Sequence, residues 1–154
     1  MNKKRVLVTY PLPDLGLREL KEKFDVHIYK DGYMPKTALL QQIRDCEGIL
    51  AAGVDLGEEE LDAAPKLKII SVFGAGYDNV DVRAATQRGI VVTNIPDTVT
   101  DSTAEMAIGL MLSTMRRIAE CDRRLRTDDT FQWGMMKNMG RLLYGKELGI
   151  IGMG

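Results

Sequence analysis

The chain has 154 residues, of which 45% are apolar and 28% charged, and its formal net charge is −1. The apolar fraction is sufficient for a core in one domain, or in one domain with part of a second. The near-neutral charge gives no reason to expect a nucleic acid or an anionic membrane as a partner.

Two cysteines, Cys46 and Cys121, lie far apart and in no metal-binding spacing, which predicts reduced structural thiols and no metal site. The apolar run at residues 6–8 is too short for the core of a signal peptide, and no stretch is long enough to span a bilayer. We therefore expect a soluble, cytoplasmic protein.

Short apolar runs alternate with amphipathic segments over the first ninety-odd residues. Strands are predicted at residues 5–9, 25–29, 48–52, 67–72 and 90–93. Helices are predicted at about 15–24, 37–43, 58–63 and 82–88, the second capped by Thr37. This alternation is typical of an α/β fold, a doubly wound parallel sheet with a flavodoxin-like layout. The only histidine, His27, falls on the second strand and is assigned no catalytic role.

A glycine-containing loop, Gly74-Ala75-Gly76, directly follows the fourth predicted strand. In an open parallel sheet, ligands bind at the carboxyl ends of the strands. Glycine permits positive φ and a close approach of the backbone, so successive N–H groups here could face a small anion. The alternative is an ordinary tight turn, with Asp78 or Asp81 capping the helix that follows.

The segment 94–97 contains Pro96 and predicts a firm hinge after the sheet. Beyond it, Ser102 and Glu105 have the spacing of a capping box at the start of a helix expected to run from Met106 to about Glu120. The first half of this helix is apolar nearly all round, so it must be buried on several sides.

The sequence ends with a predicted strand at 148–151 that leads into Gly152-Met153-Gly154. A dinucleotide-binding motif needs a third glycine, a helix, and an acidic residue about twenty positions later. By spacing alone, the segment is half of such a motif.

Taken together, these residues resemble the D-isomer-specific 2-hydroxyacid dehydrogenases. The motifs that carry the resemblance follow one another in the order and spacing of that family. They are Gly74-Ala75-Gly76-Tyr77-Asp78-Asn79-Val80-Asp81, Arg88-Gly89-Ile90, Val92-Thr93-Asn94-Ile95-Pro96, Thr100-Asp101-Ser102-Thr103-Ala104-Glu105, and Gly145-Lys146-Glu147-Leu148-Gly149-Ile150-Ile151-Gly152-Met153-Gly154. Among its members, the glyoxylate and hydroxypyruvate reductases are the most similar.

The resemblance implies a substrate domain at residues 1–96 and the incomplete start of a Rossmann-type NAD(P)-binding domain at 97–154. It also implies a homodimer. The implied substrate-binding residues are Leu50, Ala51, Ala52, Gly74, Ala75 and Gly76, with the loop at Ala75-Gly76 presenting N–H groups to a carboxylate. The implied residues for the cofactor, NAD or NADP, are Thr103, Gly152 and Gly154.

The catalytic arginine, glutamate and histidine of the family match no residue of this sequence, because they come from a region after Gly154. The expected function is hydride transfer between NAD(P)H and a small 2-oxo acid such as glyoxylate, performed by a longer parent protein. The alternative is a stand-alone module that binds a small carboxylate and catalyses nothing. Sequence beyond Gly154 would distinguish the two.

Overall fold

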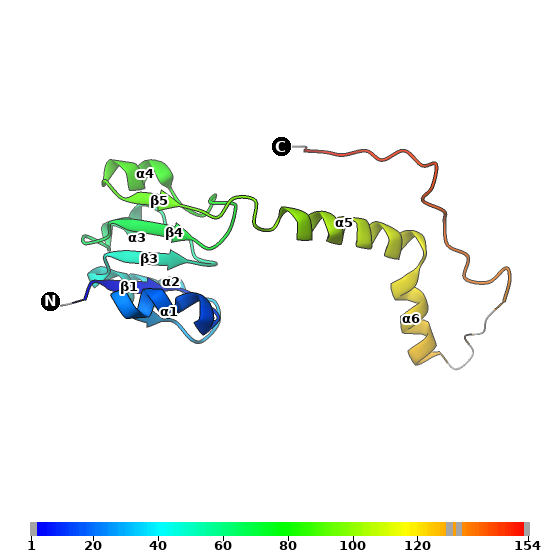
Figure 1. Ribbon diagram of the computed structural model, residues 1–154, viewed down its shortest axis with the longest axis horizontal. Coiled ribbons are helices and arrows are strands. Elements are labelled where there is room, and N and C mark those ends of the chain that lie inside the picture. The colour runs from blue at the N-terminus through cyan, green and yellow to red at the C-terminus, as the bar shows by residue number, and fades with distance from the viewer. Residues whose placement is uncertain (1–2, 129–130, 132–133, 153–154) are drawn as a thin grey trace. The chain divides into compact units, whose positions relative to one another are not determined.

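The computed structural model describes residues 3–128, 131 and 134–152, and the chain divides into two compact units, Met1–Thr98 and Val99–Gly154 (Figure 1). Within the described ranges, no helix is both long and apolar enough to cross a membrane. The two units are described separately below.

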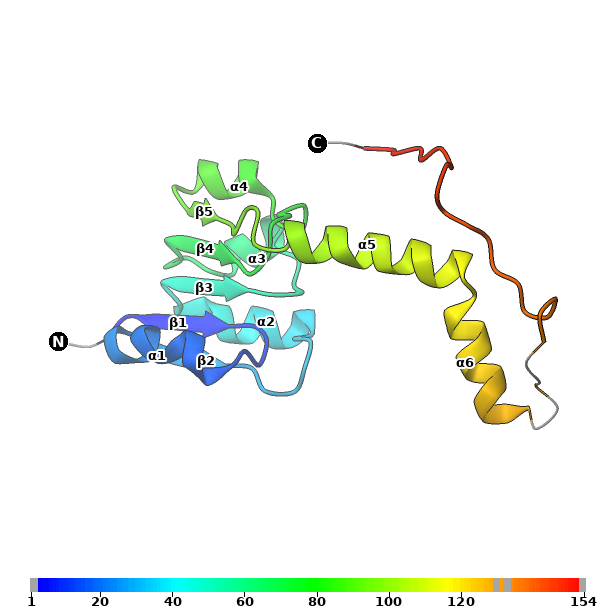
Figure 2. The same ribbon diagram turned by 45° about the vertical axis from the view of Figure 1, so that its right-hand side comes forward.

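A five-stranded parallel sheet forms the centre of the first unit, in the order β2-β1-β3-β4-β5 (Figures 1 and 2). The strands are β1 (Arg5–Val8), β2 (Asp25–Ile28), β3 (Gly48–Ala51), β4 (Ile69–Val72) and β5 (Val91–Thr93). All four pairings are parallel. The predicted α/β class with a doubly wound parallel sheet is therefore confirmed, and each observed strand falls inside its predicted range.

Helices connect successive strands. They are α1 (Asp14–Lys23), α2 (Lys36–Gln42) with the short 3-10 helix η1 (Ile43–Asp45), α3 (Glu58–Asp62) and α4 (Val82–Gln87). The predicted cap at Thr37 is wrong, because α2 already begins at Lys36 and Pro35 occupies the N-cap position. The carbonyl of Pro35 accepts the first helical hydrogen bond, from Leu39 N at 3.0 Å.

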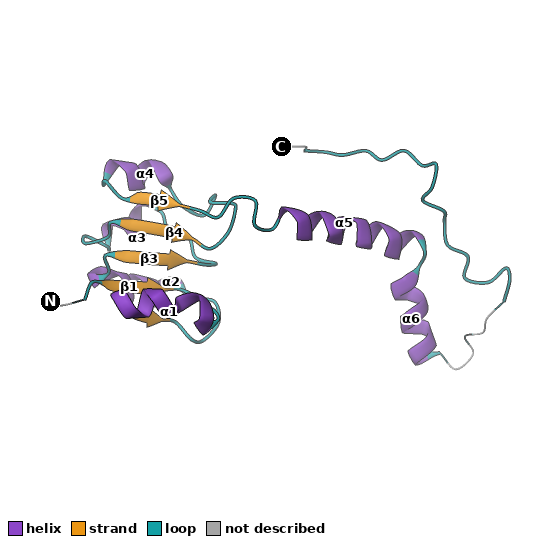
Figure 3. Ribbon diagram, in the orientation of Figure 1, coloured by secondary structure: helices purple, strands orange, loops and turns teal. Residues whose placement is uncertain are grey.

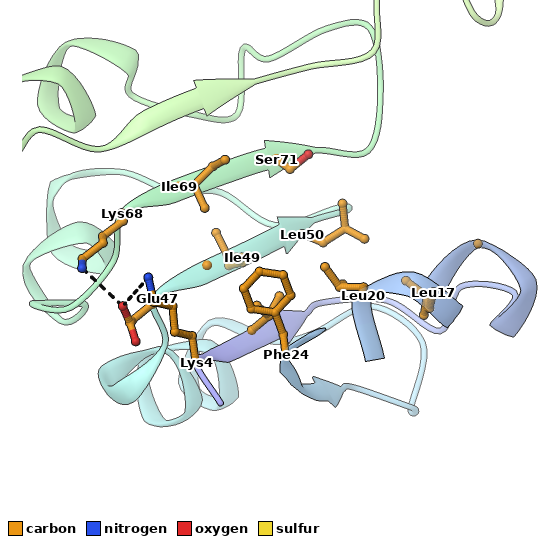
Figure 4. Close-up of a pocket in the computed structure, with 13 residues that line it drawn as sticks. Lys4, Leu17, Leu20, Phe24, Glu47, Ile49, Leu50, Lys68, Ile69 and Ser71 are labelled. Atoms are coloured by element: carbon orange, nitrogen blue, oxygen red, sulfur yellow. Dashed lines mark ion pairs between the residues drawn. The ribbon is translucent and has the colours of Figure 1, made fainter. Parts of the chain in front are cut away.

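The two faces of the sheet are covered unequally. Side chains alternate between faces along a strand, and one set, including Ile49 and Ile70, is buried in a core with residues of α2, α3 and α4. On the other face, α1 leaves a cavity of about 520 Å³ between itself and strands β1, β3 and β4. Figure 4 shows Leu50 and Ile69 on this face, together with Leu20 and Phe24.

The second unit contains α5 (Thr100–Met115) and α6 (Ile118–Thr127), and the residues described after α6 have no regular secondary structure (Figure 3). The prediction of one helix from Met106 to Glu120 is wrong at both ends. The helix begins six residues earlier, at Thr100, and Arg117 adopts a left-handed φ of 57°, which interrupts it and starts α6. The Arg117 side chain pairs with Glu120 across the first turn of α6.

The predicted capping box at Ser102 is also wrong. Because the helix starts upstream, Ser102 lies inside its first turn, and its hydroxyl donates to the carbonyl of Val99 at 3.1 Å. The N-cap residue, Val99, has no side-chain cap.

The predicted strand at 148–151 is absent. Leu148, Ile150 and Ile151 are exposed and form no ladder, because the described part of this unit contains no other strand with which to pair. A β-strand needs a neighbour to satisfy its backbone hydrogen-bonding groups. The apolar pattern alone therefore did not produce a strand.

Candidate functional site

A cavity of about 420 Å³ lies beyond the carboxyl ends of β3 and β4. One wall is formed by residues 51–55, which follow β3, and the other by residues 72–74 with Gly76 and Asn79, which follow β4. Four of the residues implied by the family resemblance line this cavity: Ala51, Ala52, Gly74 and Gly76. The cavity is at the edge of the sheet where a parallel α/β fold is expected to bind ligands.

Leu50 does not belong to this cavity. Its side chain lines the cavity under α1, on the opposite face of the sheet from that of Ala51 (Figure 4). The reason is the two-residue period of a strand, which sends neighbouring side chains to opposite faces. The structure thus brings Ala51 and Ala52 to the site but not the side chain of Leu50.

Two peptide groups in the glycine loop have fixed orientations. Ile95 N donates to the carbonyl of Gly74 at 2.9 Å, and Asn94 Nδ2 donates to the carbonyl of Ala75 at 2.7 Å. Both peptide bonds are trans, so each N–H points opposite to the carbonyl of its own peptide group. The amides of Ala75 and Gly76 are therefore directed away from the segment that follows β5.

Pointing away from that segment means pointing toward β3, because β4 lies between β3 and β5 in the sheet. Gly74 and Gly76 of this loop line the cavity, whereas Ala75 is not among its lining residues. Among the described residues, neither the Ala75 nor the Gly76 amide has a hydrogen-bond acceptor. Two unpaired N–H groups in fixed orientations can bind a small anion such as a carboxylate.

The glycine loop was expected to use positive φ angles, but neither Gly74 nor Gly76 has one. A Cβ atom added at Gly76 would lie 3.4 Å from Asp78 Oδ2, and one at Gly74 would lie 3.8 Å from the nearest backbone oxygen. The turn itself therefore places little demand on these residues. Their contribution is bare backbone facing a cavity. The capping role considered for Asp81 is observed, as its Oδ1 accepts from Ala84 N at 2.8 Å.

Asn79 joins the two walls. Its side-chain Nδ2 donates to the carbonyl of Val54 at 2.6 Å, and its own carbonyl accepts from Leu56 N at 2.8 Å. From the sequence, no role at the site was expected for Asn79, and Asn94 was expected only as part of the hinge segment. Asparagine directly after a strand can bind loop backbone through its amide, so its position at this sheet edge was the available signal.

The cavity wall carries almost no charge. Asp55 is the only ionisable residue among those that line it. A bound carboxylate would therefore be held by backbone dipoles without a cationic side chain, which limits the affinity that this chain can supply by itself.

His27 is distant from this cavity in the sheet, because β1 separates β2 from β3. Its Nε2 lies 3.1 Å from Asp25 Oδ2, and its Nδ1 lies 3.3 Å from a guanidinium nitrogen of Arg5. These two neighbours satisfy both ring nitrogens.

The residues implied for the cofactor do not form a binding turn. Thr103 is an exposed residue in the first turn of α5. Gly152 is exposed, with a φ of 81°, and no strand or helix adjoins it in the described part of the chain. Gly154 lies outside the described residues. A pyrophosphate site of the Rossmann type is built from a strand, a tight turn and a helix N-terminus, and the described residues next to Gly152 are in neither a strand nor a helix.

Comparison with known proteins places this geometry in a family. Residues 6–145 match the D-isomer specific 2-hydroxyacid dehydrogenase catalytic domain. Glyoxylate reductase from Korarchaeum cryptofilum is 39% identical over 155 residues, which cover 99% of this chain and 47% of that protein. The chain thus spans about half the length of the curated relatives that it matches.

Solved structures support the same family assignment. A D-isomer specific 2-hydroxyacid dehydrogenase from Polaromonas sp., described as NAD-binding, aligns with a TM-score of 0.88 and 29% identity over 100% of this chain and 49% of its own. An NADPH-dependent glyoxylate/hydroxypyruvate reductase from Sinorhizobium meliloti, in complex with NADP and malonate, aligns with a TM-score of 0.68 and 38% identity over 82% of this chain and 39% of its own. The resemblance carried by the sequence motifs is confirmed: this chain belongs to the D-isomer-specific 2-hydroxyacid dehydrogenase family.

Proposed function

We propose that this chain forms the substrate-binding part of an NAD(P)-dependent oxidoreductase that interconverts a small 2-oxo acid, such as glyoxylate or hydroxypyruvate, and the corresponding D-2-hydroxy acid. The observation that carries the proposal is the pair of unpaired amides at Ala75 and Gly76, in a loop whose two glycines line the cavity. Family membership and the names of the relatives support the choice of substrate class.

In this proposal the two N–H groups hold the carboxylate of the substrate. The wall at residues 51–53 faces the remainder of the substrate and limits its size. A bound nicotinamide would supply the hydride, while residues of this chain bind and orient the carboxylate. The carboxylate site, in contrast, needs only residues of the first unit.

Binding can be tested in the chain itself by titrating glycolate and following backbone amide resonances. We expect saturable shifts at Ala75 and Gly76, with a dissociation constant in the millimolar range because no cation lines the cavity. Glycolamide, which has the same shape but no negative charge, should leave both resonances unchanged. Equal shifts with the amide and the acid would remove these amides from the site.

The stand-alone carboxylate-binding module remains the second candidate, because the cavity is complete within the first unit. The chain alone should show no NADH oxidation with glyoxylate or hydroxypyruvate under either reading. Turnover that disappears in His27→Ala would contradict both the role proposed here and the absence of a role for His27. A fusion can separate the two candidates. In it, this chain is joined to the region of a glyoxylate reductase relative that the chain does not cover, and turnover should be restored only if the oxidoreductase proposal is correct.

We also propose that the partner of α5 is a second copy of the chain. This helix exposes four large apolar side chains, Met106, Ile108, Leu110 and Leu112, and no residue of it is buried. Apolar side chains spread around a helix require cover on several sides. Two copies of the same helix provide matching surfaces for a symmetric contact.

A further inference from the structure

One side chain outside the cavity holds the wall at residues 51–53 in place. Thr9 directly follows β1 and is fully buried. Its Oγ1 accepts a hydrogen bond from Ala52 N at 2.8 Å and donates to the carbonyl of Ala52 at 3.0 Å, while Thr9 N donates to the carbonyl of Leu50 at 3.1 Å. A single hydroxyl therefore satisfies both backbone groups of Ala52.

The other side of the same wall is held by an aromatic ring. Gly53 has a left-handed φ of 65°, and a Cβ atom added there would lie 2.6 Å from two ring carbons of Tyr33. The Tyr33 ring thus occupies the space that any other residue at position 53 would need. It also contacts the ring of Tyr10, with the centroids 5.2 Å apart. Thr9 therefore anchors Ala52 through its hydroxyl, and the exposed Tyr33 ring lies against Gly53.

These contacts determine which groups the wall can offer. The Ala52 amide is bonded to Thr9 and cannot turn toward a ligand. Ala52 and Gly53 instead present small, apolar surface to the cavity, opposite the amides of the glycine loop. Ala52 cannot move back to admit a larger substituent without losing its hydrogen bonds to the buried Thr9 hydroxyl.

We propose that Thr9 is a positioning residue that, together with Tyr33, sets how large a 2-substituent the cavity accepts on a bound 2-hydroxy acid. The proposal rests on the proposed function, because it assumes that the carboxylate binds at Ala75 and Gly76. Thr9 itself does not line the cavity and acts through Ala52.

The test compares the affinities of the whole chain for glycolate and for the bulkier D-3-phenyllactate, measured by amide shifts. In Thr9→Val, which keeps the shape but removes the hydroxyl and both of its hydrogen bonds to Ala52, we expect the preference for glycolate to fall by about tenfold. Thr9→Ser should restore it, because serine keeps the hydroxyl. Tyr33→Ala should shift the preference in the same direction, and it should fold normally, since Tyr33 is 73% exposed.

The control is Ile43→Val, which removes a buried methyl group from η1, outside the wall. It lowers stability, so it separates general loosening from an effect on the wall. An unchanged preference in Thr9→Val and Tyr33→Ala, with normal glycolate binding, would overturn the positioning role alone. An equal change in Ile43→Val would also overturn it. Failure of the unmodified chain to bind glycolate would overturn the proposed function and the role of Thr9 with it.

Discussion

The two units of this chain use their apolar residues in opposite ways. In the first unit, Leu7, Ile49 and Ile70 are buried to 2% exposure or less between the sheet and its helices. In the second unit, α5 and α6 contain no buried residue, although α5 is rich in methionine, leucine and isoleucine. Hydrophobic sequence therefore forms a core only where the same chain supplies the opposing surface. The first unit supplies it, and the described part of the second does not.

The sharpest test of this contrast removes the same side chain from each unit. Ile70→Ala, in the buried centre of β4, should lower the free energy of unfolding of the first unit by about 2–5 kcal/mol, because it leaves a cavity. Ile108→Ala, on the exposed surface of α5, should change that free energy by less than about 0.5 kcal/mol. Urea denaturation followed by sheet amide signals at low protein concentration measures both. Similar losses in the two variants would mean that the units share one core.

The second test concerns the surface that α5 leaves exposed. If a second copy covers it, light scattering should show association that rises with concentration. Ile108→Lys should then weaken this association at least about tenfold, since a large buried apolar side chain contributes about 1.5–3 kcal/mol. Leu15→Lys is the matched control, because Leu15 is equally an exposed apolar residue, but on α1. A strictly monomeric chain with α5 amides as protected as the sheet would contradict the proposed dimer.

The third test asks whether the carboxylate site is complete within the first unit. Gly76→Val adds a side chain beside the two unpaired amides, while the fold should tolerate it because the φ of Gly76 is not positive. Glycolate binding should weaken by at least about tenfold, or about 1.4 kcal/mol. Gly16→Val, where an added Cβ meets nothing within 4 Å, should leave binding unchanged. Unaltered affinity in Gly76→Val would remove the loop from the site.

The smallest effect concerns Glu60, the one buried carboxylate of the first unit. Burial by itself raises the pKa of Glu60, but hydrogen bonds from Lys36 and the Gly57 amide outweigh it, so its pKa lies below the usual value. A carboxylate whose pKa is lower in the folded than in the unfolded state stabilises the fold at pH values above its unfolded-state pKa. This stabilisation is lost as the pH falls through the folded-state pKa.

Glu60→Gln should therefore reduce the loss of stability between pH 7 and pH 3 by about 1 kcal/mol. Thermal unfolding of the variant and the original chain at both pH values gives this difference. The control is Glu19→Gln on the exposed face of α1, which should leave the pH dependence as it was. An identical pH dependence in Glu60→Gln would show that these hydrogen bonds do not favour the charged carboxylate.

The sheet could be predicted because its signals are local. The strands of the first unit are short, mainly apolar runs, except for β2, in which Val26 and Ile28 alternate with polar residues, and the residues that cover the sheet belong to the same unit. The same apolar pattern at 148–151 predicted a strand that is not formed, because strand pairing requires a neighbour that no local pattern supplies. The break in the predicted long helix depends on a single left-handed residue, Arg117, which helix periodicity does not reveal.

The candidate site was predictable only in part, because only some of its signals are local in the sequence. The glycine loop follows its strand in the sequence and could be recognised there. The groups that hold the site are distant in sequence: 43 residues separate Thr9 from Ala52, and 19 separate Asn94 from Ala75. Polar side chains at strand ends are common, and only the strand order shows which backbone groups they reach.

The hydrogen bonds from Asn94 and Ile95 to the glycine loop have a mechanical consequence. The polypeptide runs from these two residues through Pro96 and Asp97, whose φ is 64°, to the end of the first unit at Thr98. These hydrogen bonds join the start of the connector to the two peptide groups of the proposed anion site. Because a bound anion would fix the orientation of these peptide groups, we expect it to stiffen the connector, and any such coupling acts in both directions. Relaxation measurements on residues 97–98 with and without glycolate would detect this stiffening, and Asn94→Ala should abolish it.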